Sequence, residues 1–197
     1  MEQLTPVRPL EETQSSSAIE SQIRECFGRV VYSHKTHEKC ADLLLIRHNR
    51  IKLLQILLSV ITTGSLIVTL LGQGRASTIV AAFASAGLLA LNSYTKDYDL
   101  GQMSQKHKAT ASSLWNIRET YFSLLTDMNS GLINPENVIS KRDQLQQELL
   151  VIYESSPRTV PKAYTKAQKA IKVDEDLTFS DAEIDHFLPS PLKKKAQ

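Results

Sequence analysis

The stretch "LLQILLSVITTGSLIVTLLGQGRASTIVAAFASAGLLALNSY", from Leu53 to Tyr94, decides the fold, because it carries a single formal charge, Arg75. Residues 53–71 are uncharged and make a helix about 28 Å long, which matches a hydrocarbon core of roughly 30 Å. The glycines of "GQGR" then stand where a helix breaks. Residues 77–94 are uncharged again and of similar length. Two such segments joined by so short a turn predict an antiparallel transmembrane hairpin.

Basic residues flank this stretch on both sides, which sets the expected orientation. Three precede the first span and three follow the second, whereas the turn holds only Arg75: Arg47, Arg50 and Lys52 before, Lys96, Lys106 and Lys108 after. Because basic loops stay on the cytoplasmic side, we expect both termini in the cytoplasm and the hairpin in the cell inner membrane. The alternative is a soluble helical bundle that buries the hairpin. Both spans are apolar nearly all round, which favours a bilayer.

A polar stripe interrupts the apolar surface of the first span. At about 100° per residue, the positions 55, 59, 62, 66, 69 and 73 fall within roughly 80° of one face, and all but Leu66 are polar. A weaker strip in the second span holds Thr78, Ala82, Ser85, Leu89 and Asn92. The candidate pore-lining or helix-contact residues are Gln55, Ser59, Thr62, Thr69, Gln73, Ser85 and Asn92.

This stripe has two interpretations. Small and hydroxylated residues allow helices to pack closely and to form hydrogen bonds, so the stripe can be a helix contact. Alternatively, several hairpins assemble and the stripe lines water. From the residues alone the contact is slightly favoured. Neither span holds a charged residue, which argues against a proton relay or an ion-binding site.

Heptad-like patterns predict long helices on both sides of the hairpin. Apolar and histidine positions recur at three- and four-residue steps from Ile23 to Ile51 and from Leu100 to Met128. The hairpin places these helices side by side as a stalk, with a bend expected at Gly101. Further helices are expected from "NPEN" to before Pro157, from Pro161 to about Lys172, and after a capping box formed by Ser180 and Glu183.

The expected organisation is all-α, with a two-helix transmembrane hairpin and long flanking helices that form a cytoplasmic helical bundle. The expected segments are a disordered lead-in (1–16), a juxtamembrane helix (17–52), transmembrane helix 1 (53–71), a turn (72–76), transmembrane helix 2 (77–94), cytoplasmic helices (95–172) and an acidic linker with a short helix and basic tail (173–197).

Candidate chemistry is sparse. His34, His37 and Cys40 are three residues apart, but Cys40 lies about 240° around a helix from His34, so we expect no metal site. Cys26 and Cys40 lie roughly 21 Å apart on one helix, which excludes a disulfide between them. Asp97 and Asp99 are interpreted as solvated surface rather than a cation ring. Phosphate-binding glycine loops and catalytic clusters are lacking, so neither an enzyme nor a cofactor is expected.

The partners expected from composition are lipids rather than nucleic acids. The net charge is only +2, and the charges crowd into the two flanks instead of forming one basic face. Direct binding of nucleic acid is therefore not expected, and a lipid bilayer is.

The chain resembles the SLATT proteins, two-transmembrane effectors of bacterial nucleotide-signalling and related conflict systems. The resemblance rests on "IRHNRIKLLQILLSVITTGSLIVTLL", the small-residue second span and "ATASSLWNIRETYFSLLTD". The ending "DEDLTFSDAEIDHFLPSPL" resembles a branch that includes members linked to reverse transcriptases. The resemblance implies an antiphage effector that forms a homo-oligomer and permeabilises the membrane when a separate sensor protein or nucleotide signal activates it. It thereby favours the pore over the helix contact.

The resulting hypothesis is an abortive-infection membrane effector that forms a pore. A non-conducting membrane scaffold, whose cytoplasmic helices recruit a partner, is the alternative, and a soluble helical regulator is the third possibility.

Overall fold

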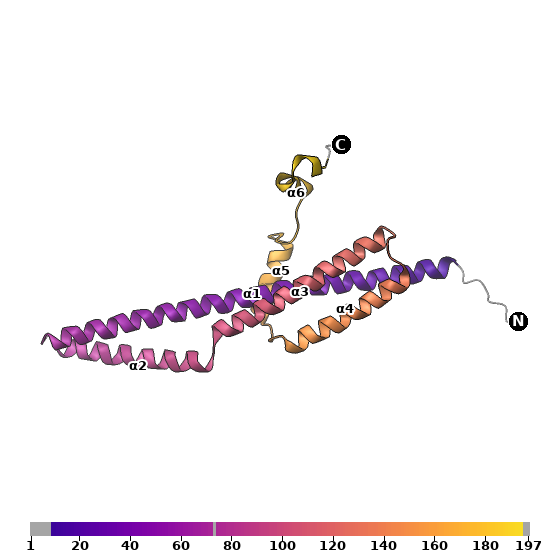
Figure 1. Cartoon of the computed structure of the whole chain (residues 1–197). Helices are drawn as coiled ribbons and strands as arrows, with labels where there is room; N and C mark the ends of the chain where they lie inside the picture. The colour runs from indigo at the N-terminus through magenta and orange to yellow at the C-terminus, as the bar shows by residue number, and fades with distance from the viewer. Residues whose placement is uncertain (1–8, 73, 195–197) are drawn as a thin grey trace.

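The computed structural model describes residues 9–72 and 74–194, and every regular element among them is helical (Figure 1). This confirms the all-α prediction. The elements are α1 (Pro9–Leu70), α2 (Arg75–Asp97), α3 (Leu100–Asn129), α4 (Pro135–Ser155), α5 (Pro161–Lys172), α6 (Asp181–Phe187) and a 3-10 turn (Ser190–Leu192).

Helix α1 joins the predicted juxtamembrane helix and the first span into one uninterrupted element of 62 residues. It is about 93 Å long, and after Pro9 its sequence contains no proline that would break it. The helix includes residues 9–16, which belong to the predicted lead-in, whereas residues 1–8 lie outside the described part.

Helix α2 runs antiparallel to α1 and makes the hairpin seen at one end of the molecule (Figure 1). Gly72 and Gly74 both adopt positive φ, 79° and 89°, a conformation that side chains with a Cβ rarely take, and so they form the turn. The face of α2 that meets α1 is built from small residues: Ala81 and Ala84 are buried, and Gly87 faces Leu58. Small side chains let the two helices approach closely.

The bend between α2 and α3 lies two residues before the predicted position. Helix α2 ends at Asp97, and the Asp99 carboxylate accepts a hydrogen bond of 2.8 Å from the Gln102 backbone N–H, so Asp99 caps α3. Gly101 has a different role. A Cβ on Gly101 would lie 3.0 Å from the His48 ring, so glycine lets the start of α3 pack against α1.

Helix α3 returns along α1, which confirms that the two flanking helices lie side by side. Together with α4 they enclose the core of the bundle, and α5 crosses α1 on an alanine face (Figure 1). The core residues are Ile23, Val30, Leu114, Ile117, Tyr121, Leu124, Val138 and Leu145. The alanines of α5 are Ala163, Ala167 and Ala170.

Ion pairs hold the segment after α5 against α1. The Asp176 carboxylate lies 3.1 Å from the Lys35 ammonium, which is buried and also pairs with Glu38. Beyond it, Ser180 and Glu183 form the predicted capping box at the start of α6.

Candidate functional site

The two ends of the predicted polar stripe form hydrogen bonds across the hairpin. The Gln55 side-chain amide donates to the Asn92 side-chain oxygen at 2.9 Å and lies 3.3 Å from the Thr95 hydroxyl. Near the turn, the Thr69 hydroxyl lies 2.8 Å from the Ser77 hydroxyl and 3.4 Å from that of Thr78. The structure therefore brings Gln55 together with Asn92 and holds Thr69 against the start of α2.

The middle of the stripe is arranged differently. The Ser59 hydroxyl donates to the Gln55 carbonyl at 2.9 Å, and that of Thr62 donates to the Leu58 carbonyl at 2.8 Å. Both bonds stay within α1, so these hydroxyls are satisfied without a second helix. Ser59 is exposed and Thr62 is half-buried.

Ser85 and Gln73 do not join the other predicted residues. Ser85 is exposed on the outer surface of α2, because α2 uses Ala81 and Ala84 to meet α1. Gln73 lies outside the described residues.

A groove follows the stripe at the end of the hairpin nearest the bundle. It has a volume of about 450 Å³, and α1 and α2 both contribute to it. Its walls are Lys52, Gln55, Ile56, Ser59, Val60, Leu88 and Asn92. Gln55 and Ser59 of the stripe, together with Asn92 of α2, thus open to the outside of a single hairpin.

The rest of the hairpin surface is apolar and uncovered. Two helices are long and apolar enough to cross a membrane: the most apolar 18-residue windows have mean hydropathies of 2.1 and 1.5 and are 0% and 11% buried. Leu70 and Phe83 are 86% and 76% exposed. A soluble protein would need its flanking helices to cover this surface, and the described helices do not. An uncovered apolar surface of this kind fits a lipid environment.

Histidines meet in the interior of the bundle, between α1 and α3. The Nδ1 atoms of His37 and His107 lie 3.1 Å apart, and His34 Nδ1 lies 2.9 Å from the Ala111 carbonyl, to which it donates. Burial, followed by the nearby His107 and His34, lowers the pKa of His37 to about 4. Burial also lowers the pKa of His107. The pair is therefore neutral at pH 7.

These histidines do not assemble a metal centre with Cys40. Across residues 9–72 and 74–194, no three His, Cys, Asp or Glu side chains gather closely enough to hold a metal ion. Burial raises the pKa of the Cys40 thiol, so it is not a reactive thiolate.

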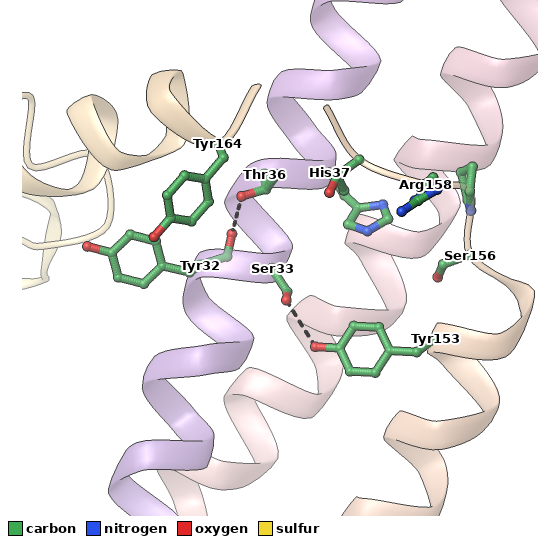
Figure 2. Close-up of a pocket in the computed structure, with 10 residues that line it drawn as sticks. Tyr32, Ser33, Thr36, His37, Tyr153, Ser156, Arg158 and Tyr164 are labelled. Atoms are coloured by element: carbon green, nitrogen blue, oxygen red, sulfur yellow. Dashed lines mark hydrogen bonds between the residues drawn. The ribbon is translucent and has the colours of Figure 1, made fainter. Parts of the chain in front are cut away.

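A cavity of about 340 Å³, with several hydroxyl groups in its wall, lies beside His37, between α1, α4 and the start of α5 (Figure 2). The Tyr153 hydroxyl donates to the Ser33 hydroxyl at 3.0 Å, and His37 and Arg158 both line the cavity (Figure 2). Sequence reasoning missed this cavity, because its walls come from segments about 120 residues apart and no local spacing links them.

A family model described as "SMODS and SLOG-associating 2TM effector domain family 4" matches residues 19–183. The match includes both helices of the hairpin and most of the bundle. It does not address the link to reverse transcriptases, which stays a prediction. Comparisons with curated proteins and with solved structures give no match.

Proposed function

Because the chain belongs to the SMODS and SLOG-associating two-transmembrane effector (SLATT) family, we propose that it is a membrane effector of bacterial antiphage defence. In this proposal the α1–α2 hairpin spans the inner membrane with both termini in the cytoplasm. Several copies assemble and permeabilise the membrane, which stops the infected cell. The observation that carries the proposal is an uncovered apolar hairpin with a polar stripe open on one side.

The surface of the hairpin supports insertion, and the basic residues support the orientation. Leu53, Ile56 and Val60 are 58%, 60% and 64% exposed, as lipid-facing residues are. Arg47, Arg50 and Lys52 precede the first span, and Lys96 follows the second, so positive charge gathers on the side of the bundle.

The middle of the stripe supports a pore built from several copies. A single hairpin cannot enclose water, so its polar groups need neighbouring copies around a common axis. Ser59 and Thr62 are available for this, because α2 does not bond to their hydroxyls. The trigger in this proposal is a separate sensor protein or nucleotide signal that acts on the cytoplasmic bundle.

Replacing Ser59 and Thr62 together by leucine tests the pore. We expect the double variant to insert normally but to lose membrane depolarisation in cells and dye release from vesicles, because the water-facing hydroxyls are gone. Thr63→Leu is the matched control, since Thr63 is an exposed threonine of the same span that lies off the stripe. Unchanged leakage from a well-expressed double variant would contradict a pore lined by this face.

A non-conducting scaffold is the second candidate, and the two ends of the stripe favour it. Gln55 and Thr69 bond to α2 within one hairpin, as residues that only join helices do. Dye release by the purified protein separates the two functions, because a scaffold leaves vesicles intact.

A further inference from the structure

The charges around the hairpin all have one sign. Between Asp42 and Asp97 the sequence contains no aspartate or glutamate, whereas it contains five arginine or lysine residues. They are Arg47, Arg50, Lys52, Arg75 and Lys96. Whether these charges matter for a pore depends on which of them lie next to the polar stripe, and the structure of the hairpin answers that.

Lys52 lies at the end of the groove that follows the stripe. It lines this groove together with Gln55, Ser59 and Asn92, and its side chain is exposed. Arg50 precedes Lys52 by two residues, and two residues turn a helix by about 200°, so Arg50 lies on another side of α1. Of these two charges at the same level of α1, only that of Lys52 belongs to the groove.

On α2, Lys96 continues the line of Asn92. It follows Asn92 by four residues, which is about 6 Å along the helix and about 40° around it. The nearby acidic residues are directed elsewhere, because Asp97 lies about 140° around α2 from Asn92 and the Asp99 carboxylate caps α3. In the part of the chain that the structure describes, neither Lys52 nor Lys96 forms an ion pair.

The far end of the stripe is positive as well. Thr69 is the last described residue of the stripe, and its hydroxyl lies 3.4 Å from that of Thr78, three residues after Arg75. In the proposed orientation, basic residues are expected on the side of the bundle, but this tendency does not explain Arg75 on the opposite side. A pore lined by the stripe would therefore have positive charge at both mouths and negative charge at neither.

We propose that the pore selects anions and that Lys52 is the residue that determines this selectivity. When several copies turn their grooves towards a common axis, their Lys52 ammonium groups form a ring at the mouth on the side of the bundle. Rings of Lys or Arg favour anions. In water, one ammonium group about 4 Å away raises the local concentration of a monovalent anion roughly fivefold and lowers that of a cation by the same factor. The inference rests on the proposed function, because it requires a pore.

The test is electrical recording from the purified full-length protein in planar bilayers of phosphatidylcholine, with different potassium chloride concentrations on the two sides. The reversal potential gives the ratio of chloride to potassium permeability. We expect the wild-type protein to prefer chloride about fivefold or more. Lys52→Glu is expected to reverse the preference, because it replaces the positive ring by a negative one, and Lys52→Arg is expected to retain it.

Arg50→Glu is the matched control, because it reverses the same charge at the same level of α1 but away from the groove. We expect this variant to keep the wild-type permeability ratio. The comparison also tests the alternative that Lys52 only anchors the span at the lipid headgroups. Replacing a residue that only anchors the span would leave the ratio unchanged. Resistance of each variant to alkaline carbonate shows that it has inserted.

The inference fails if chloride and potassium permeate equally, if potassium is preferred, or if Arg50→Glu shifts the ratio as far as Lys52→Glu does. In each of these cases a conductance remains, so the pore of the proposed function stands without its selectivity. Absence of any conductance from the wild-type protein, at every protein density in the bilayer, removes the pore and the selectivity together.

Discussion

Among single residues, the buried pair of His37 and His107 gives the clearest pH dependence. The pKa of His37 is about 4 in the folded chain and about 6.5 when unfolded, because burial and the neighbouring His107 and His34 disfavour the charged form. The unfolded chain therefore binds more protons between these values. The contribution of His37 to the free energy of unfolding is fully present above pH 6.5. It is lost as the pH falls towards 4, and the loss is on the order of 2 kcal/mol.

The measurement is the thermal unfolding midpoint of the bundle in detergent at pH 7.5 and at pH 5. His37→Gln is expected to reduce the difference between the two values. His186→Gln is the control, since His186 lies exposed on α6. If His37→Gln and the wild type show the same difference in unfolding midpoint between pH 7.5 and pH 5, other groups cause the pH dependence.

Gln55 and Asn92 form the other testable pair. Their hydrogen bond joins α1 to α2, so removing either partner is expected to destabilise the hairpin. A double-mutant cycle with Gln55→Leu and Asn92→Leu is expected to give a coupling energy of about 0.6 kcal/mol. The readout is unfolding of the hairpin in mixed micelles. Gln55→Leu combined with Ser85→Leu, on the outer face of α2, is expected to be additive.

Among the helices, the junction between α2 and α3 depends on one carboxylate. Asp99→Ala removes the cap of α3 and is expected to cost about 1 kcal/mol and to speed amide exchange in the first turn of α3. Asp99→Ser is expected to restore the cap. Asp97→Ala, two residues earlier at the last position of α2, is the control for the loss of negative charge. Equal exchange rates in Asp99→Ala and wild type would contradict this role.

The helices themselves follow closely from the sequence, because their signals are local. Three signals can each be recognised from a few neighbouring residues. They are the three- and four-residue spacing of apolar positions, the prolines at the start of α4 and α5, and the capping box of α6. The face of α2 that meets α1 does not follow from the sequence. Small residues lie on more than one face of that span. Ala82 and Ala86 are as suitable by size as Ala81 and Ala84, and the choice between the two faces depends on the fit to α1.

The candidate site divides in the same way. The stripe on α1 can be predicted from the sequence, because its polar residues recur at three- and four-residue steps. Its hydrogen bonds to Asn92 and Ser77 cannot be predicted in this way, because they depend on how α2 packs against α1. The histidine pair and the cavity beside it combine residues from distant segments, and a single sequence holds no signal for such meetings.

For the molecule as a whole, the uncovered hairpin predicts behaviour in fractionation. We expect the chain to sediment with membranes, to resist alkaline carbonate and to be released by detergent. Replacing Leu57 and Ile61 by arginine places two charges within the span, at about 3 kcal/mol each, and is expected to abolish this resistance. The same change at Leu150 and Val151, exposed on α4, is the control. A compact monomer in the supernatant without detergent would refute membrane insertion.

The unequal construction of the two long arms has a mechanical consequence. One arm, α1, is a single rigid rod from the bundle to the hairpin tip, whereas the other is articulated at Tyr98 and Asp99. A rotation of α1 at its bundle end is expected to be carried towards the tip of the hairpin, since the helix has no break between them. The second arm, which consists of α2 and α3, can bend at Tyr98 and Asp99 between these two helices. If the proposed function holds, a signal received on the bundle, about 50 Å from the bilayer, is expected to reorient the span without unfolding α1.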